Sequence, residues 1–432
     1  MTHPAPTLPD ATADAGTQIA QGWGQPPSAR YEALAAPFRP LFRDIAAGAA
    51  ARDRDRQLPF AEWDRLKQAG FTRLRVPTSQ GGAGVTLPEL FALLIELSEA
   101  DSNLTNILRP HIGFTEDLLN TDDAVYARRW LEVIARGETF GNGFSELAGN
   151  VGVTSTRLTR DGDGWRLNGE KYYTTGTLFA DWINLGAIDE QGAPKGAIVP
   201  RHAPGVEVPD DWNGFGQTLT ASGSTRYRDV FLSNDLVKAE TRRPRYVGAF
   251  FQLVHVATLA GIGRAVANEG ARLVVARQRT YGHGNAAEAR HDPQVLAVVG
   301  KARGSAYAAG TVAQTVAAAL ERVHAANRAG NAAAEQQAGV LADVEINQAV
   351  TVVSDLVLNA ATGIFDALGA SGSDRTHGLD RHWRNARTIT SHNPRIYRDR
   401  IVGAFAVNGE APAVFGGPRP AEAHAETAPA AF

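Results

Sequence analysis

The sequence predicts an α+β protein in which a helical domain comes first, a β domain second and a helical bundle last. Three stretches with different apolar periods support this order. Apolar side chains recur every three to four positions over residues 29–137, the period falls to two over 138–240, and long helical periods return over 241–410. A chain of 432 residues has room for two to four domains, so we expect one domain for each stretch.

The helical character of the first stretch is clearest near residue 86. Thr86 and Glu89 have the spacing of a capping box, in which a hydroxyl and a carboxylate satisfy free backbone amides at a helix start. Leucines and a phenylalanine then follow at three- to four-residue intervals, which predicts one apolar helix face. The glycine-rich segment 81–84, directly before this helix, is expected to be a loop.

Short alternating runs predict the strands of the second domain. Segment 161–164 has the composition of a turn, and Asn168-Gly169 is a typical hairpin signal. Together the runs predict a β-barrel or sandwich. The strands are expected at 153–158, 165–167, 171–175, 182–187, 195–200 and 225–232.

The third stretch holds three long segments with apolar periodicity and almost no proline, at 248–278, 293–328 and 335–367. Helices of this length pack most simply as an antiparallel bundle, so a C-terminal four-helix bundle is expected. The chain ends, 1–28 and 411–432, are rich in proline, alanine and threonine. This composition predicts flexible tails.

The composition argues against several classes of function. Lys and Arg total 43 against 46 Asp and Glu, so no basic excess favours nucleic-acid binding. The chain has no cysteine, which excludes disulfides, thiol nucleophiles and iron–sulfur clusters. No apolar run approaches the ~18 residues of a membrane span, and the first thirty residues lack the pattern of a secretory signal. We therefore expect a cytoplasmic protein without nucleic-acid or membrane partners.

The histidines show no pattern of metal ligation. His283, His291 and His377 lie in expected loops without the spacing of ligands, so no metal site is expected. His255 and His382 are assigned to structure, because a lone histidine on an apolar stretch is often a satisfied core residue.

Three segments in the right order resemble the acyl-CoA dehydrogenase superfamily over about residues 30–410. Segment 69–85 resembles the family's glycine-rich loop before a helix, and 141–146 stands where the family has a flavin-contacting stretch ending in Thr-Glu. Segment 167–176 resembles the motif L-N-G-x-K-x-W-I-T-N. The resemblance implies a helical domain, a β domain and a helical bundle in this order.

The C-terminal part resembles the flavin-dependent monooxygenase branch, which includes dibenzothiophene monooxygenases and related sulfur-acquisition oxygenases. Segment 379–388, followed by His392-Asn393-Pro394, carries this resemblance, together with 220–224. His392 stands where many dehydrogenases of the superfamily have their catalytic carboxylate. Segment 366–373 lacks the glutamine, second glycine and tyrosine that hold the adenine half of FAD in dehydrogenases. The resemblance therefore implies reduced FMN supplied by a separate flavin reductase, with FAD as the less favoured alternative.

The resemblance also implies a set of site residues. The catalytic candidates are His392, His111, Thr175 and Asn142. The flavin candidates are Asn142, Ser145, Tyr173, Thr175, Arg279 and Arg387, with Arg277 and Arg303 as further arginines that could pair with a phosphate. The pocket candidates are Phe114, Phe144, Trp212, Phe215, Phe250 and Phe251, which could equally be core residues. For His111 and Asn142 a purely structural role is as plausible as a functional one.

These observations predict a two-component FMN-dependent monooxygenase that uses O2, through a flavin hydroperoxide, to oxygenate a small apolar substrate. Sulfur is the expected site of oxygenation, while nitrogen or aromatic carbon remains open. Relatives form dimers or tetramers, so a homo-oligomer is expected. The alternatives are an FAD-dependent acyl-CoA dehydrogenase or oxidase with a displaced base, and a non-catalytic helical interaction module.

Overall fold

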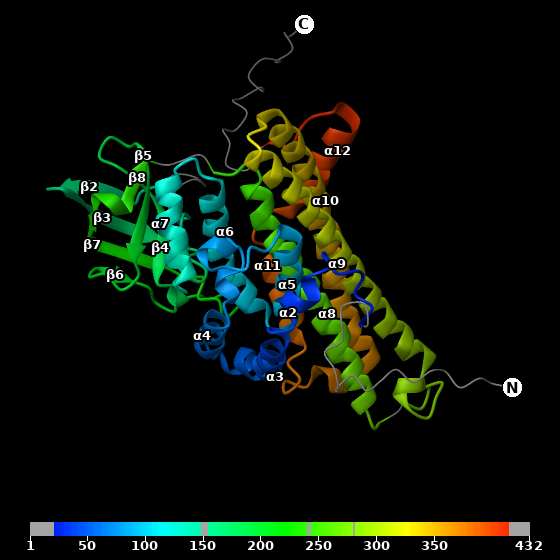
Figure 1. The fold of residues 1–432 in the computed structure, drawn as a ribbon. Coiled ribbons are helices and arrows are strands. Elements are labelled where there is room, and N and C mark those ends of the chain that lie inside the picture. Colours follow the sequence, from blue (N-terminus) through cyan, green and yellow to red (C-terminus); the bar gives the residue numbers. More distant parts are fainter. Residues whose placement is uncertain (1–20, 148–153, 240–242, 280, 414–432) are drawn as a thin grey trace, which may run out of the picture.

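The computed structural model describes residues 21–147, 154–239, 243–279 and 281–413. Figure 1 shows a sheet at one side, a group of long helices at the other, and the N-terminal helices between them. The N-terminal helices are α2 (Tyr31–Ala35), α3 (Arg39–Asp55), α4 (Phe60–Gln68), α5 (Leu87–Ala100), α6 (Ser102–Asn120) and α7 (Ala124–Ala135).

The start of α5 confirms the predicted capping box. The Thr86 side chain accepts a hydrogen bond from the Glu89 amide, and the Glu89 carboxylate accepts one from the Thr86 amide. α5 is buried on nearly all sides because it packs between α3 and α6 on one side and the long C-terminal helices on the other. This packing joins the first domain to the third through one hydrophobic core.

The second domain is a mixed sheet whose strands follow the spatial order β6-β7-β3-β2-β4-β5-β8, and β1 pairs in parallel with β4. Side chains along β4 alternate between buried and half-buried positions, as the period of two predicts. The strands are β1 (Phe140–Gly143), β2 (Arg157–Asp161), β3 (Gly164–Lys171), β4 (Trp182–Ile188), β5 (Pro194–Pro200), β6 (Val206–Glu207), β7 (Thr225–Ser233) and β8 (Val237–Ala239).

The hairpin predicted at Asn168-Gly169 is wrong. β3 continues through both residues to Lys171, and its pairing with β7 shifts register between Leu167 and Gly169. Gly169 has a φ of 146°, and the Asn168 side chain accepts a hydrogen bond from the Asp229 amide of β7. The two residues therefore form an irregularity within a strand, which uses the same residue types as a turn.

The third domain consists of α8 (Val247–Ala276), α9 (Pro293–Arg328), α10 (Ala332–Leu368), α11 (Asp380–Thr390) and α12 (Arg398–Asn408). α8, α9 and α10 pack on one another, α11 lies against α8 and α10, and α12 lies against α10. By length and composition alone, α8 and the segment Ala332–Ser373 could cross a membrane, but 94% of the most apolar window of α8 is buried inside this protein. α8 is thus a core helix.

The predicted tail, residues 1–28, extends too far along the chain, because its last described residues pack against the helices. Trp23 is buried, and the guanidinium carbons of Arg264 and Arg303 lie 4.9 and 4.1 Å from its ring centre. This single aromatic side chain fixes the segment against α8 and α9. Residues 1–20 and 414–432 lie outside the described residues.

Candidate active site

Two of the segments that carry the family resemblance meet in space at the ends of β1 and β3. The Tyr172 amide donates a hydrogen bond of 2.9 Å to the Ser145 carbonyl. The Lys171 ammonium lies 2.6 Å from the Glu146 carboxylate, and both side chains are buried. The Asn142 amide donates to the Thr177 hydroxyl at 3.0 Å. Segments 141–146 and 171–177 therefore form one surface, on which the predicted residues Asn142, Ser145, Tyr173 and Thr175 lie.

The backbone around this surface adopts an uncommon conformation. Tyr173, Gln217 and Ala221 have φ values of 59°, 51° and 46°, in the left-handed region that favours glycine. Each costs a non-glycine residue roughly 1–2 kcal/mol. Residues in this conformation persist only where surrounding contacts hold them in place. They are found mainly at functional sites. The Tyr173 ring is half exposed and lies edge-on to Trp212, with ring centres 6.2 Å apart.

A row of hydroxyl groups lies behind Tyr173. Thr175 and Ser222 share a hydrogen bond of 2.8 Å, and Ser222 shares another of 2.7 Å with Thr220. The Asn142 Oδ1 and Gln217 Oε1 atoms are buried and have no hydrogen-bond partner in the described part of the chain. Buried polar atoms without partners are costly, so these two oxygens are points at which a polar ligand could add a hydrogen bond.

Gly176 brings helix α6 against this surface. Its φ is 76°, and a Cβ at this position would lie 2.3 Å from the Ile107 carbonyl of α6. A second close approach occurs at Gly113 of α6, where a Cβ would lie 2.2 Å from the Phe251 ring of α8. Glycine is required at both points because no side chain fits. The strand ends, α6 and α8 are thereby held close together.

A pair of histidines lies where α8 meets the loop after α11. The rings of His255 and His392 have centres 4.5 Å apart at an angle of 61°. His255 is buried, whereas His392 packs against it with one side of its ring and keeps part of its surface exposed to solvent. The protein packed around one side of His392, followed by the charge of Arg109, lowers the pKa of its imidazole below the usual value. Burial and the same charge also lower the pKa of His255 well below its usual value. Both imidazoles are therefore neutral near pH 7.

Arg109 of α6 is the cation that acts on both histidines. Its side chain is buried, its Nε donates to the Phe251 carbonyl at 3.3 Å, and its guanidinium carbon lies 4.7 Å from the Phe251 ring centre. Burial, followed by the charge of Arg243, lowers the pKa of Arg109 to about 9, so it stays charged at neutral pH. No carboxylate in the described ranges pairs with it.

Comparison with known proteins assigns this architecture to a family. Residues 30–138 match the N-terminal domain of acyl-CoA dehydrogenases, and residues 253–394 match their C-terminal domain. The chain belongs to the acyl-CoA dehydrogenase superfamily. The predicted family and fold class are thereby confirmed.

Several similar members of the superfamily are named as monooxygenases. The chain is 28% identical over 391 residues to the probable FMNH2-dependent monooxygenase SfnC of Pseudomonas putida, covering 87% of this chain and 95% of that protein. It is 27% identical over 389 residues to dibenzothiophene monooxygenase of Mycolicibacterium goodii, covering 86% and 90%. The structure of methanesulfinate monooxygenase MsuC from Pseudomonas fluorescens matches with a TM-score of 0.79 at 25% identity, covering 88% and 98%.

The environment of His111 does not favour the predicted catalytic role. Its Nε2 lies 2.6 Å from the Thr72 carbonyl, and its Nδ1 accepts a hydrogen bond of 3.2 Å from the Phe140 amide. The ring is fully buried, and burial lowers its pKa to about 4. Since both ring nitrogens are used by the backbone, His111 joins α6 to β1 and has no nitrogen left for a ligand.

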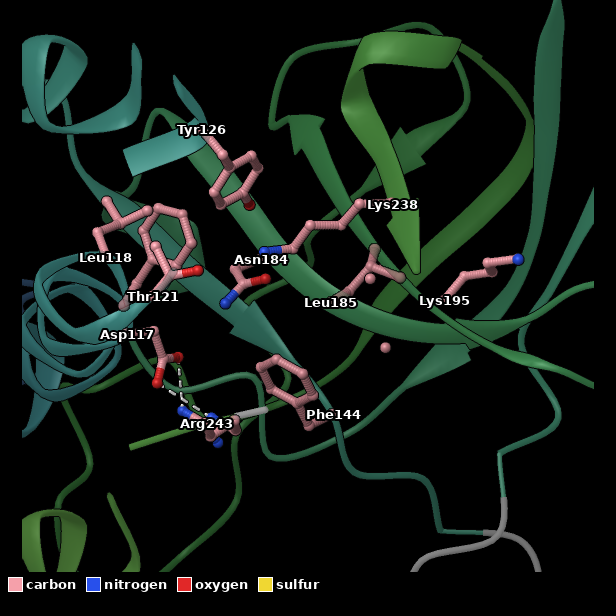
Figure 2. Close-up of a pocket in the computed structure, with 13 residues that line it drawn as sticks. Asp117, Leu118, Thr121, Tyr126, Phe144, Asn184, Leu185, Lys195, Lys238 and Arg243 are labelled. Atoms are coloured by element: carbon pink, nitrogen blue, oxygen red, sulfur yellow. Dashed lines mark hydrogen bonds and ion pairs between the residues drawn. The ribbon is translucent and has the colours of Figure 1, made fainter. Parts of the chain in front are cut away.

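The aromatic residues predicted to line a pocket divide between pocket, surface and core. Figure 2 shows a pocket of about 60 Å³ between α6, α7 and the sheet, which Phe144 and Phe114 line together with Arg243. Trp212 contacts Tyr173, and Phe215 lies against Trp383 at the surface. The prediction for Phe250 is wrong, because this residue is fully buried in the core and packs against Phe91 of α5.

The pocket of Figure 2 adjoins the histidine site through Arg243. Its guanidinium is bound to the Asp117 carboxylate at 2.8 Å, and its central carbon lies 5.7 Å from the Phe144 ring centre and 5.3 Å from the Phe251 ring centre. Arg109 and Arg243 thus both contact the same phenylalanine ring. Phe251, rather than Phe250, is the aromatic residue of α8 that faces the site.

The predicted phosphate-binding arginines lie at different distances from the site. Arg387 is on α11, five residues before His392, and is half buried. Arg279 lies three residues beyond the C-terminal end of α8 and is exposed. At 1.5 Å per residue it lies roughly 35 Å along the chain from His255, so it cannot reach a group at His392 of its own chain.

Sequence reasoning missed Arg109 and assigned His255 to structure. Both could have been suspected, because each is a polar residue within an apolar helical stretch. The residues three and four positions from Arg109 include no acid that could pair with it on the helix. His382, in contrast, is structural as predicted, since its Nε2 lies 3.1 Å from the Glu269 carboxylate. In the described part of the chain, no three His, Asp or Glu side chains gather as metal ligands would.

Proposed function

We propose that this protein is the oxygenase of a two-component monooxygenase, which uses reduced FMN and O2 to oxygenate a small organosulfur compound. The protein is an oxidoreductase, and its relatives are monooxygenases by name, one of them FMNH2-dependent. One structural observation supports the proposal independently of the names of the relatives. The site holds two neutral imidazoles and an arginine, and no described carboxylate acts on His255 or His392. Removal of an α-proton by a carboxylate base, which acyl-CoA dehydrogenation needs, has no candidate here.

The residues at the strand ends fit a flavin ring. Tyr173 and Trp212 provide aromatic edges, and Thr175 and Ser222 provide hydroxyl groups. The unpartnered Asn142 Oδ1 can accept a hydrogen bond from a ring N–H. Arg387, which is half buried on α11 near His392, would be the partner of a phosphate from the same chain, and Arg279 could only meet the phosphate of a second copy. Bound reduced FMN supplies the electrons that activate O2.

The protein contributes a protected space and oriented hydrogen bonds. A neutral imidazole has one N–H donor and one acceptor, so His392 can donate to an oxygen atom beside it while His255 orients its ring. The Phe251 and Phe144 rings both lie near the Arg243 guanidinium, and a ligand bound beside them would lose contact with water on that side. Arg109 adds a fixed positive charge, which favours negative charge that develops on oxygen.

The partners of this reaction are part of the proposal. A flavin reductase would supply the reduced FMN, as the resemblance to the two-component monooxygenases implies. A homo-oligomer would bring Arg279 of one copy toward the site of another. The sequence already led us to expect a reductase partner and a homo-oligomer, and both are retained in this proposal.

The decisive experiment mixes anaerobic protein and reduced FMN with oxygenated buffer in a stopped-flow instrument. We expect oxygen consumption to precede the return of oxidised-FMN absorbance by a clear interval, because the site delays release of peroxide. Oxidised FMN that returns at the rate seen without protein would contradict the proposal. Anaerobic bleaching of bound FAD by an acyl-CoA thioester would favour the dehydrogenase instead, and absence of flavin binding in both redox states would favour an interaction module.

The histidine pair provides the second part of this test. We expect His392→Ala to shorten the interval and to raise the yield of free hydrogen peroxide per reduced FMN, because the reacting oxygen loses a hydrogen-bond donor. His377→Ala, which changes a histidine in a loop outside the site, is the matched control. An unchanged peroxide yield in His392→Ala would remove His392 from the reaction.

A further inference from the structure

Three buried hydroxyl side chains form one continuous hydrogen-bonded chain beside the candidate flavin surface. The Thr175 and Ser222 oxygens lie 2.8 Å apart, and the Ser222 and Thr220 oxygens lie 2.7 Å apart. The Thr220 hydroxyl then donates a hydrogen bond of 2.8 Å to the Gln217 carbonyl. We call these three hydroxyl residues the hydroxyl chain. It starts at a residue of the flavin surface and ends on a backbone carbonyl.

The carbonyl end fixes the direction of every hydrogen bond in the hydroxyl chain. A carbonyl oxygen only accepts and a hydroxyl has one proton, so the Thr220 proton is committed to the Gln217 carbonyl. Thr220 must then accept the proton of Ser222, and Ser222 must accept the proton of Thr175. Within the described residues these hydroxyls have no other partner. Thr175 therefore has no proton to offer a ligand and can only accept a hydrogen bond from one.

Thr175 is the end of the hydroxyl chain that a ligand can reach. The exposed fraction rises along the chain from 0% for Thr220 through 5% for Ser222 to 8% for Thr175. The other end is enclosed, because the Gln217 carbonyl also accepts a hydrogen bond of 3.0 Å from the Trp212 indole. A ligand on the flavin surface thus meets the hydroxyl chain as a single acceptor whose direction is set from inside the protein.

The flavin ring changes its hydrogen-bonding character at one nitrogen when it is reduced. In oxidised FMN the ring nitrogen N5 carries a lone pair and only accepts, whereas in reduced FMN it carries a proton and donates. The nitrogen N3 carries a proton in both states, so a group that faces N3 does not distinguish them. An acceptor that faces N5 forms a hydrogen bond with the reduced ring and meets a lone pair in the oxidised ring, where the bond stays unmade.

We propose that Ser222 and Thr220 are positioning residues, which hold Thr175 as an acceptor toward the flavin and thereby make this surface bind reduced FMN in preference to oxidised FMN. The inference rests on FMN as the cofactor and deepens the proposed function, but it does not depend on the substrate that is oxygenated. A preference of this kind would let a separate reductase exchange spent oxidised FMN for reduced FMN at the site.

Anaerobic ultrafiltration of the full chain with oxidised FMN, and separately with reduced FMN, tests the inference. We expect the wild type to bind reduced FMN at least about tenfold more tightly, because one hydrogen bond made rather than lost contributes about this factor. In Thr220→Val the Ser222 proton can turn to Thr175, which frees the Thr175 proton for the bare nitrogen of oxidised FMN. We therefore expect Thr220→Val to bind oxidised FMN more tightly than the wild type, which brings the ratio of the two affinities toward one. Structural damage would instead weaken the binding of both forms. An unchanged ratio would overturn the inference.

A second pair of hydroxyls provides the matched control. The Thr225 hydroxyl donates to the Thr174 hydroxyl at 2.9 Å, and Thr174 donates to the Gly223 carbonyl at 3.0 Å. This pair is as buried as the hydroxyl chain but is not hydrogen-bonded to it. Thr225→Val should therefore keep the wild-type ratio, and an equal fall of the ratio in this variant would overturn the inference.

Two further variants keep the test decisive. Thr220→Ser retains the hydroxyl and should retain the preference for reduced FMN. Ser222→Ala disconnects Thr175 from the chain and should lose the preference, as Thr220→Val does, so it decides the question if Thr220→Val does not fold. A preference that survives in Ser222→Ala would overturn the inference.

The midpoint potential of bound FMN is an independent readout. A protein that binds the reduced form tenfold more tightly raises the two-electron potential by about 30 mV relative to free FMN. We expect this rise in the wild type and in Thr225→Val, and its loss in Thr220→Val. A wild type that binds both forms equally but still delays the return of oxidised FMN would overturn this inference and leave the proposed monooxygenase standing. Absence of binding in both redox states would overturn both.

Discussion

Two histidines that look alike in the sequence differ in what surrounds them. Both ring nitrogens of His111 are hydrogen-bonded to backbone groups of other segments. The His392 ring, in contrast, packs against His255 and is partly exposed. Burial lowers the pKa of each, but only His111 is fully enclosed. The surroundings of His111 therefore fit a structural role, and those of His392 fit the role proposed for it in the reaction.

The buried neutral state of His111 makes stability depend on pH. The pKa of His111 is about 4 in the folded protein and near 6.5 in the unfolded chain, so the unfolded chain binds more protons below pH 6.5. Stability is thus lost as the pH falls from 6.5 toward 4, by about 2 kcal/mol at pH 5 for this residue. We expect His111→Gln to be less stable than the wild type at pH 7 but to lose less stability between pH 7 and pH 5.

Urea midpoints of the two proteins at both pH values check this prediction. His291→Gln serves as the control, because His291 is exposed and should leave the pH dependence unchanged. Equal shifts of the midpoint in wild type and His111→Gln would show that His111 is not buried in the neutral form.

At the scale of secondary-structure elements, a buried ion pair joins the ends of β1 and β3. The Glu146 carboxylate accepts hydrogen bonds from the Lys171 ammonium and from the amide and hydroxyl groups of Ser155 and Thr156. Burial opposes ionisation, but these bonds outweigh it and lower the pKa of Glu146 to about 2. The pair fixes the surface on which Tyr173 and Thr175 lie.

Breaking this pair should damage both stability and cofactor binding. We expect Glu146→Gln to destabilise the protein by about 3–5 kcal/mol, because the fully buried Lys171 would lose its carboxylate partner. We also expect weaker binding of reduced FMN, measured by fluorescence titration, because the strand ends lose their spacing. Thermal unfolding gives the change in stability.

The double variant Glu146→Gln/Lys171→Met is the matched control. It removes both charges, so it should recover a large part of the stability lost in Glu146→Gln. If the double variant is less stable than Glu146→Gln, the unpaired lysine is not the cause of the loss.

At the scale of the whole molecule, the long helices leave apolar side chains uncovered. Leu341 and Val352 of α10 are exposed, as are Leu296 and Tyr307 of α9. Each pair is separated by eleven residues, close to three helical turns, so its members lie on one face of the helix. A face of this kind on a helix bundle is typical of an interface between subunits.

We expect the protein to be a dimer or tetramer at micromolar concentration, as measured by light scattering after gel filtration. Leu341→Arg/Val352→Arg should shift the mass toward the monomer, because two charges would be buried at the interface. It should also weaken flavin binding if Arg279 acts on a second copy. Val125→Arg, at an exposed position on α7, is the control. A wild-type monomer would contradict both the interface and the role of Arg279.

The order of domains was predictable because it depends on apolar periods that each segment carries by itself. The long helices α8, α9 and α10 begin and end within a few residues of their predicted bounds, and the Thr86 cap is where its spacing places it. Asn168-Gly169 shows the limit of local signals. The same two residues form a turn or a strand irregularity, and pairing with β7 decided between them.

The sequence by itself determined the fold, the family and the absence of thiol chemistry, because these follow from local patterns, motif order and composition. Only the tertiary structure decided what each polar residue does. It joined His255 of α8 to His392 of a distant loop, enclosed His111 between backbone groups, and left Arg109 without a carboxylate partner among the described residues. The physical reason is that burial and partners, which set the pKa and the free hydrogen bonds of a side chain, come from segments far away along the chain.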